Sequence, residues 1–293
     1  YMGCANSDPV SNLYYYDQLS RLVNTEQYRC WTPHNAYVEK NITYDADGNI
    51  RQLSRYNDPS SLVYTYVYDN SGLLNSVSNN SRTNVSVQNK SLGLPTIIDR
   101  PHGPIVITTP SSLFKENDVV YSGNEYKYDS NGNIIYDGYH GLNIRYNHLN
   151  LPRKISRGDD ILVNYVYLAD GSKYSALKGD GTGFVYEGSF IYKQSEDGNL
   201  KLESIPFNGG RFISNSNGEL LPRYFITDHL GSVRGILNEN LDIEEQNDYY
   251  QLGKHIDDPN SQLSDNRYHY NGKENQEFFD LPYLDYGARL YDP

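Results

Sequence analysis

A period-two pattern of apolar and polar positions runs through most of this chain. In the stretch "LVYTYVYDNSGLLNSV", Tyr64, Tyr66 and Tyr68 recur at every second position. Because successive side chains of a strand point to opposite faces, this pattern predicts strands with one buried face. No segment sustains apolar residues at positions i, i+3, i+4 and i+7, so helix is expected to be nearly absent.

The alternation stops at a short Asp-x-x-Gly segment and then resumes. An Asp carboxylate accepts hydrogen bonds from backbone N–H groups two or three residues later, and Gly takes the positive φ that ends such a turn. Strand, turn and returning strand together form a β-hairpin. A single hairpin is marginally stable, so neighbouring units are expected to pair edge to edge into one curved sheet.

The hairpin unit repeats along the chain. Copies begin at Tyr16, Tyr44, Tyr68 and Tyr128, of which the last three match Y-D-x-x-G, and degenerate copies begin at Tyr146 and Tyr167. The 60-residue gap between Tyr68 and Tyr128 is expected to hold one or two further degenerate copies, around residues 86–120. In the first copy, "YDQLSRL", Ser20 stands where the pattern has Gly, so a different type of turn is expected there.

Composition narrows the function classes. The chain has 293 residues, of which 30 are Tyr, and its net charge is −12. An acidic surface does not attract a nucleic-acid backbone or an anionic membrane, and no apolar run is long enough for a membrane span. Cys4 and Cys30 are the only cysteines, and both a disulfide and two unpaired thiols are compatible with their spacing. The Tyr residues predict packed cross-strand rows, with a carbohydrate-stacking surface as the alternative.

Catalytic and metal-binding patterns are missing from the sequence. The His residues have no ligand spacing, no nucleophile motif is present, and no cofactor is expected. Asp228 and His229 are adjacent, so on a strand they point to opposite faces, and a structural role within the sheet or a turn is expected for His229. The mixed-charge stretch "KENQEFFD", residues 273–280, is expected to be a solvated loop.

These motifs resemble those of a known family. The repeated Y-D-x-x-G pattern looks like the YD repeat of RHS and teneurin-like proteins. The segments "TDHLGSVR", "YHYNGKE" and "LDYGARLYDP" are similar, in order and separation, to the blocks of the RHS repeat-associated core domain, in a Bacteroidetes-like form. By contrast, "YYQLGKH" keeps only Gly253 of a further block. The residues that carry the resemblance, and that are expected to have structural roles, are Tyr44, Asp45, Gly48, Tyr68, Asp69, Gly72, Tyr128, Asp129, Gly132, Asp228, His229, Leu230, Gly231, Arg234, Gly272, Lys273, Glu274, Tyr286, Gly287, Ala288, Arg289, Tyr291, Asp292 and Pro293.

The resemblance implies an all-β fold in which laterally paired hairpins form a long, curved, spiralling sheet, a partial shell. The division implied is a YD-repeat array over residues 1–175 and a core region over residues 176–293 that continues the same sheet as one unit. About ten hairpins fit this length, fewer than a closed shell is expected to need. The chain is read as running onward from Pro293 and as part of a longer protein.

The implied function is a non-enzymatic scaffold, the C-terminal part of a toxin-enclosing shell in a secreted or cell-surface bacterial protein. The expected partners are a toxin domain or other polypeptide cargo, the rest of a longer RHS chain, and secretion machinery. An acidic inner wall would suit a basic cargo. One alternative is a glycan- or surface-binding adhesion module. The other is an aspartyl autoprotease in which Asp292 is the first Asp of a dyad whose partner lies beyond Pro293, so that this chain is silent.

Overall fold

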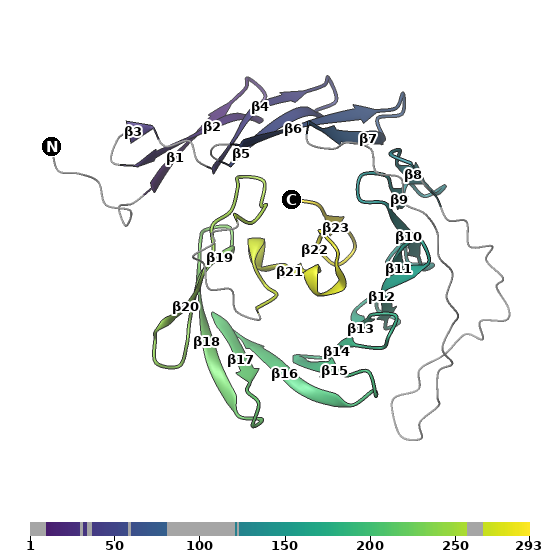
Figure 1. Ribbon diagram of the computed structural model, residues 1–293, viewed down its shortest axis with the longest axis vertical. Helices are drawn as coiled ribbons and strands as arrows, with labels where there is room; N and C mark the ends of the chain where they lie inside the picture. The colour runs from purple at the N-terminus through teal and green to yellow at the C-terminus, as the bar shows by residue number, and fades with distance from the viewer. Residues whose placement is uncertain are drawn as a thin grey trace.

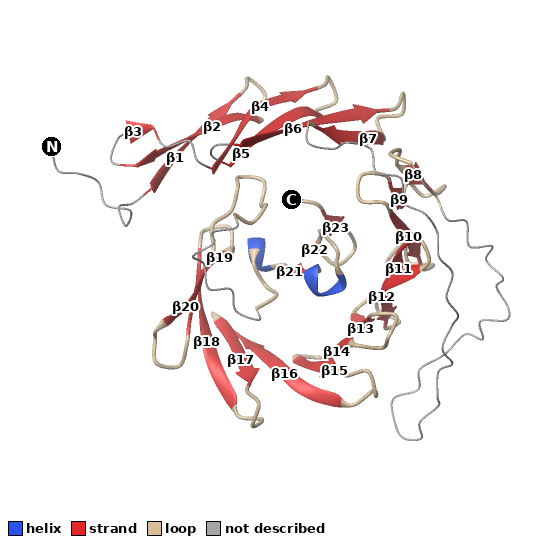
Figure 2. Cartoon of the chain, in the orientation of Figure 1, coloured by secondary structure: helices blue, strands red, loops and turns tan. Residues whose placement is uncertain are grey.

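The computed structural model describes residues 10–29, 32–33, 37–57, 60–80, 121, 123–256 and 266–293. Within these ranges the fold is all-β, as the alternating pattern predicts, and it contains no α-helix. Two short 3-10 turns occur near the C-terminus, η1 (Tyr270–Gly272) and η2 (Glu277–Phe279). Figure 2 shows that strands make up almost all of the regular structure. None of the described residues forms a helix with the length and apolar character needed to cross a lipid bilayer.

The largest unit is an antiparallel sheet of 13 strands, each paired with the strand before and after it in the chain. This order requires only hairpin connections, and short turns such as Asp129–Gly132 and Asp228–Gly231 supply them. Its strands are β8 (Lys127–Tyr128), β9 (Ile134–Asp137), β10 (Leu142–Tyr146), β11 (Pro152–Arg157), β12 (Asp160–Tyr167), β13 (Lys173–Leu177), β14 (Gly183–Glu187), β15 (Phe190–Gln194), β16 (Leu200–Phe207), β17 (Gly210–Ser214), β18 (Leu220–Thr227), β19 (Val233–Leu237) and β20 (Ile243–Gln246).

Smaller sheets precede and follow it. A three-stranded and a four-stranded sheet lie at the N-terminal end, and a three-stranded sheet forms at the C-terminal end. Their strands are β1 (Val10–Tyr16), β2 (Leu22–Arg29), β3 (Thr32–Pro33), β4 (Tyr37–Tyr44), β5 (Ile50–Asn57), β6 (Ser60–Tyr68), β7 (Leu74–Asn79), β21 (Glu274–Asn275), β22 (Leu284–Asp285) and β23 (Leu290–Tyr291).

The sheets before the C-terminal one join into a single curved wall. Ser76 of β7 bridges to Glu125, just before β8, and Tyr126 N–H donates to the Asn75 carbonyl. The Thr25 hydroxyl of β2 accepts from Glu39 N–H of β4 at 2.9 Å. Figure 1 shows the result, an open curved sheet with the C-terminal segment on its concave side.

The two ends of this curved wall meet through a loop rather than through strand pairing. The loop after β20 contains Tyr250 and Leu252. Tyr250 Oη donates to the Tyr56 carbonyl of β5 at 2.9 Å, and Leu252 N–H donates to the buried Glu39 carboxylate of β4, also at 2.9 Å. The long sheet therefore stays open in its hydrogen bonding, while the loop after β20 contacts β4 and β5 of the four-stranded sheet.

Gly253 in the same loop allows a close approach to the C-terminal segment. Its φ is +99°, and a Cβ at this position would lie 2.5 Å from the ring of Tyr270. Any other residue would clash with that ring, which gives a physical reason for the glycine at this position in "YYQLGKH".

The main core lies between the concave face of the sheet and the C-terminal segment. From the segment, Phe279, Leu281 and Tyr283 are buried against it. From strands β10–β15, the buried partners are Leu142, Ile144, Ile155, Val163, Tyr165, Ala176, Phe184 and Ile191. A hairpin sheet has two faces, and this segment provides the apolar cover that one of them needs.

Some sequence expectations fall outside the described residues, namely the state of Cys4 and Cys30 and the degenerate repeats around residues 86–120. The division at residues 175 and 176 stays a prediction. That position falls within β13, and the large sheet continues from there to β20, whereas β21–β23 pair among themselves.

Candidate functional site

The turn in each Y-D-x-x-G repeat is built around one aspartate. Asp45 Oδ1 accepts from Asp47 N–H at 3.0 Å and from Asn49 N–H at 2.8 Å, while the Asp45 carbonyl accepts from Gly48 N–H. Gly48 has a φ of +90°, the left-handed region that favours glycine. Desolvation alone would raise the pKa of Asp45, but hydrogen bonds from Asn49 outweigh it and lower that pKa below 3.8.

The same turn occurs in the other good repeats and in the D-H-L-G segment. Asp69, Asp129 and Asp228 each accept two backbone N–H bonds and are each followed three residues later by a glycine with positive φ, respectively Gly72, Gly132 and Gly231. The expectation of a different turn in the first copy is wrong. There Ser20 takes a φ of +60°, and its N–H donates to the Asp17 carbonyl in the common pattern. The turn geometry, rather than the glycine itself, is what the repeats share.

The tyrosine that precedes each turn ties its repeat to the repeat before it. Tyr44 Oη donates to the Leu22 carbonyl at 2.6 Å, and Tyr68 Oη donates to the Ile50 carbonyl at 3.0 Å. Tyr128 Oη likewise donates to the carbonyl of Leu74 at 2.7 Å. In all three cases the acceptor is the first residue of the previous hairpin's return strand. Sequence reasoning expected tyrosine rows but not this bond, because no local pattern marks the acceptor.

Asp228 and His229 do not form an acid–base pair with each other. Both lie in the turn between β18 and β19, where His229 is exposed at the second position. Asp228 instead pairs with Arg234, whose Nε lies 3.0 Å from Asp228 Oδ2. Although desolvation opposes it, hydrogen bonds from Ser232 N–H and Arg234 lower the pKa of Asp228. Leu230, also in this turn, is exposed.

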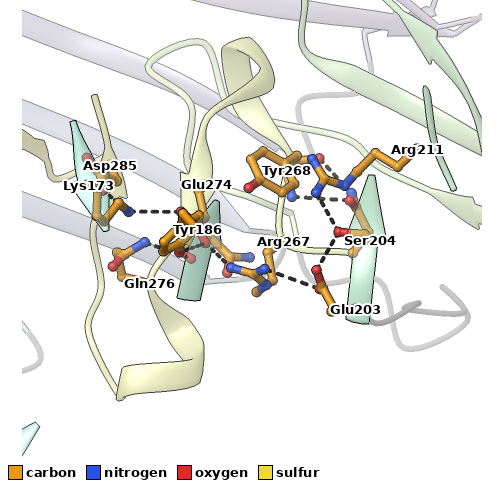
Figure 3. Close-up of polar contacts among 12 residues, drawn as sticks. Lys173, Tyr186, Glu203, Ser204, Arg211, Arg267, Tyr268, Glu274, Gln276 and Asp285 are labelled. Carbon is orange, nitrogen blue, oxygen red and sulfur yellow. Dashed lines mark hydrogen bonds and ion pairs between the residues drawn. The ribbon is translucent and has the colours of Figure 1, made fainter. Parts of the chain in front are cut away.

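The N-G-K-E block holds the C-terminal segment on the inner face of the sheet. Glu274 is buried, and its Oε2 lies 3.0 Å from Lys173 Nζ of β13 (Figure 3). Its Oε1 accepts from Tyr186 Oη of β14 at 2.8 Å and pairs with Arg267. Lys173 Nζ also contacts Asp285 Oδ2 of β22 at 2.5 Å. The expectation that residues 273–280 form a solvated loop is wrong, because the buried Glu274 carboxylate contacts Lys173, Tyr186 and Arg267 in one ion network.

Further contacts extend this network to β12, β16 and β17. Arg267 Nη2 lies 3.2 Å from Glu203 Oε1 of β16, and its guanidinium stacks 3.4 Å from the Phe184 ring centroid. Gln276 Oε1 accepts from Tyr165 Oη of β12 at 2.8 Å. Arg211 of β17 lies over the ring of Tyr268 (Figure 3). Sequence reasoning missed Lys173, Tyr186 and Arg267, since contacts this distant along the chain leave no local signal.

The remaining residues of the N-G-K-E block lie beside the last turn of the chain. Gly272 has a φ of +64° at the end of η1, and Lys273 Nζ lies 5.1 Å from the ring centroid of Tyr286.

The Y-G-A-R block forms the turn between β22 and β23. Tyr286 N–H donates to the Arg289 carbonyl at 3.0 Å, and Gly287, with a φ of +86°, donates its N–H to Asp285 Oδ1. Arg289 Nη1 donates to the carbonyl of Ala288 at 2.8 Å. Tyr291 Oη then donates to the Leu252 carbonyl of the bridging loop at 2.6 Å. This block thereby connects the internal segment to the loop that bridges the two ends of the wall.

A cavity of about 800 Å³ on the concave side surrounds the last residues of the chain. Asp292 and Pro293 line it together with Arg55. Tyrosine is the commonest residue in the rest of its wall, from Tyr64, Tyr66, Tyr68, Tyr126, Tyr128, Tyr139, Tyr146, Tyr283 and Tyr291.

Two carboxylates reach one imidazole in this cavity. His140 Nδ1 lies 2.8 Å from Asp137 Oδ2 and 3.8 Å from Asp292 Oδ2. Tyr283 Oη donates to Asp137 Oδ2 at 2.5 Å. Burial alone would raise the pKa of Asp137, but the hydrogen bond and charge of His140 outweigh burial and lower it. Burial, with the charge of Asp137 added, raises the pKa of Asp292 despite His140.

Asp137 and His140 share a hydrogen bond, whereas Asp292 lies beyond hydrogen-bond distance from the same nitrogen. Sequence reasoning expected the partner of Asp292 beyond Pro293 and did not select Asp137 or His140, which lie far away in the chain. The autoprotease role of Asp292 stays a prediction. Among the residues that the structure describes, no group of three or more His, Cys, Asp and Glu side chains is placed to hold a metal ion.

Fold and site together define a class: an open, curved wall of Y-D-x-x-G hairpins with its C-terminal segment bound on the inner face. No family model matches this chain. Among curated proteins, none matches either.

Solved structures of Tc toxins align with nearly the whole chain. One is the Tc holotoxin pore of Photorhabdus luminescens with a mutated TccC3, at 16% identity and a TM-score of 0.41, covering 96% of this chain and 16% of that one. Another is TcdB2-TccC3 without its hypervariable C-terminal region. It aligns at 16% identity and a TM-score of 0.41, covering 97% of this chain and 16% of that one. A third, TcdB2-TccC3-TEV, aligns at 14% identity and a TM-score of 0.42, covering 97% of this chain and 19% of that one. This chain thus spans less than a fifth of the length of those chains.

Proposed function

We propose that this chain is a non-enzymatic wall segment of a toxin-enclosing β-shell of the RHS type. One observation carries the proposal: residues 266–293 are tied to the concave face by the buried Glu274 network and end beside an internal cavity. A polypeptide attached after Pro293 would therefore begin on the inner side of the wall. The chain's cargo would be a toxin domain or another polypeptide.

The same proposal covers the setting of the protein. The chain acts as part of a longer RHS protein of Bacteroidetes-like type that is secreted or displayed at the bacterial surface with the help of secretion machinery. The motifs "TDHLGSVR", "YHYNGKE" and "LDYGARLYDP" support it.

Limited proteolysis tests which side of the wall the C-terminus faces. A flexible peptide with one protease site is appended after Pro293, and the same peptide is inserted at Gly188, in the exposed turn between β14 and β15. The proposal expects slower cleavage after Pro293 than at Gly188. Cleavage after Pro293 should become faster once Glu274→Gln loosens the segment. Equal rates at the two positions in the unaltered wall would contradict it.

The tyrosine-lined cavity keeps the glycan-binding alternative open to test, because aromatic faces stack on sugar rings. Tyr64 and Tyr66 both line this cavity. A glycan array probed with the parent chain and with Tyr64→Ala should show binding that this substitution abolishes while the fold is retained. Unfolding without any loss of a specific signal would assign the tyrosine a packing role.

Asp292 offers a direct test of the autoprotease alternative. The full-length gene product is expected to be cut if this alternative holds, and Asp292→Asn should prevent the cut. An uncut full-length protein would remove autoproteolysis from consideration.

A further inference from the structure

A cavity of about 1350 Å³ lies on the concave side, away from the C-terminal end. Strands β14–β20 form one side of it, and Arg267 and Phe278 of the C-terminal segment contribute to the other. Its apolar lining includes Phe184, Phe225 and Ile236. The volume exceeds that of a typical drug-sized site, so it has room for a stretch of polypeptide.

The charge of this cavity is opposite to that of the whole chain. Three acidic side chains line it, Glu196, Glu203 and Glu244, against five basic ones, so its formal charge is +2 whereas the chain carries −12. The basic residues are Lys178, Lys193, Lys201, Arg223 and Arg267. This part of the concave face therefore carries a net positive charge.

Two of the lysines oppose each other without a compensating carboxylate. Lys193 of β15 and Lys201 of β16 are direct cross-strand partners, and neither forms an ion pair with any described residue. Like charges placed directly opposite on a sheet are destabilising. Lys178, which pairs with Asp280 at 4.0 Å, adds a third ammonium nearby, because both its Nζ and that of Lys193 lie within 6 Å of the Phe278 ring centroid.

The other two basic residues already have partners. Arg267 pairs with Glu203 and Glu274, and Arg223 pairs with Glu239 and Glu244. The unbalanced positive charge is therefore concentrated at Lys193, beside the aromatic ring of Phe278, and at Lys201, whose Nζ donates to the Ser216 carbonyl.

We propose that this cavity binds an acidic polypeptide segment whose carboxylates pair with Lys193 and Lys201 and whose apolar side chains pack on Phe184, Phe225 and Ile236. The charge of the cavity selects the acidic groups, and its apolar lining selects a peptide over a simple anion. The inference names the chemistry of the cargo and rests on the proposed wall function.

Fluorescence anisotropy with labelled peptides tests the site. The probes are a twelve-residue peptide of alternating Glu and Leu, a Lys–Leu peptide of opposite charge and a Glu–Ser peptide without apolar side chains. The Glu–Leu peptide is expected to bind tightest, and its binding should weaken with salt. The double substitution Lys193→Gln with Lys201→Gln should weaken binding about tenfold, because each exposed pair contributes up to about 1 kcal/mol.

Lys154→Gln serves as the matched control, since Lys154 of β11 lies outside the cavity. It should leave binding unchanged. The double substitution should also maintain or raise the thermal midpoint, because it removes like-charge repulsion, whereas a structural role for these lysines would lower the midpoint. Equal binding of the Glu–Leu and Lys–Leu peptides, or no effect of the double substitution, would overturn the inference.

The two proposals fail separately. If the peptide after Pro293 is protected but no acidic peptide binds, only the cargo chemistry is wrong. If that peptide is cut as fast as the one at Gly188, the wall function itself is wrong.

Discussion

The Glu274 carboxylate and the Lys173 ammonium, 101 residues apart in the chain, lie 3.0 Å from each other in the interior. This pair joins the C-terminal segment to β13. Because Tyr186 and Arg267 also bond Glu274, the carboxylate is the shared acceptor of three separate elements. That one side chain is thus a shared polar anchor of the internal segment, beside the buried Phe279, Leu281 and Tyr283.

Glu274→Gln should therefore destabilise the protein strongly. It leaves Lys173 and Arg267 buried with less compensation, and breaking a buried pair by removing one partner costs about 3 kcal/mol or more. Urea unfolding followed by tyrosine fluorescence measures the change. Glu187→Gln, at an exposed position of β14, is the matched control and should stay within about 0.5 kcal/mol of the parent. Similar values for the two would show that the network does not hold the segment.

Removing one hydroxyl should reveal the bond between repeats. Tyr44→Phe loses the hydrogen bond to the Leu22 carbonyl and should cost about 1 kcal/mol of unfolding free energy. Tyr16→Phe alters the corresponding tyrosine of the first repeat, whose side chain is 59% exposed, and should be nearly neutral. Equal losses at both positions would mean that the hydroxyl acts through something other than the repeat contact.

A leucine stands in a turn position suited to glycine. Leu241 has a φ of +67° and is 66% exposed in the turn between β19 and β20. The left-handed conformation costs a bulky L-residue about 1 kcal/mol, so Leu241→Gly should raise the unfolding free energy by about that amount. Leu230→Gly is the control. Leu230 is an exposed leucine of another turn and is not in the left-handed region, so this substitution should not raise the unfolding free energy. A loss of stability in Leu241→Gly would show that side-chain contacts outweigh the backbone strain.

Acid should weaken the contact between Asp137 and His140. The pKa of Asp137 lies below its unfolded value of 3.8, so its contribution is fully present above pH 3.8 and is lost as the pH falls through the lower folded-state pKa. Asp137→Asn should therefore reduce stability at pH 7, and the difference from the parent should shrink below pH 3.8. Denaturant titrations across pH 7 to 3 measure it, with the exposed Asp159→Asn as control. A difference that stays constant with pH would contradict the assignment.

Replacing Asp292 should change the stability at pH 7 in the opposite direction from replacing Asp137. Its pKa is raised, so its charged form is disfavoured in the folded protein, and Asp292→Asn should maintain or increase stability at pH 7. This advantage should vanish below pH 3.8, where the unfolded carboxyl is protonated too. Since 47% of the side chain is exposed, water reduces the effect. Destabilisation at pH 7 would indicate that the contact with His140 outweighs the burial.

The sequence by itself determined the strands, the turns and their order. Period-two alternation and Asp-x-x-Gly are local signals, and the bonds that make each turn, such as those of Asp45 to Asp47 and Asn49, join residues within four positions of each other. Even the turn at Ser20 follows the common geometry, because the Asp17 bonds set it without a glycine.

Only the tertiary structure decided what the C-terminal blocks do. The mixed charges of residues 273–280 are typical of a solvated loop, yet Glu274 and Gln276 are buried because Lys173, Arg267 and Tyr165 approach from distant strands. The charge of the inner cavity was equally hidden, since the opposition of Lys193 and Lys201 depends on strand register. Local propensity decides a hairpin, whereas the pairing of buried charges depends on how the long sheet curves back around its own end.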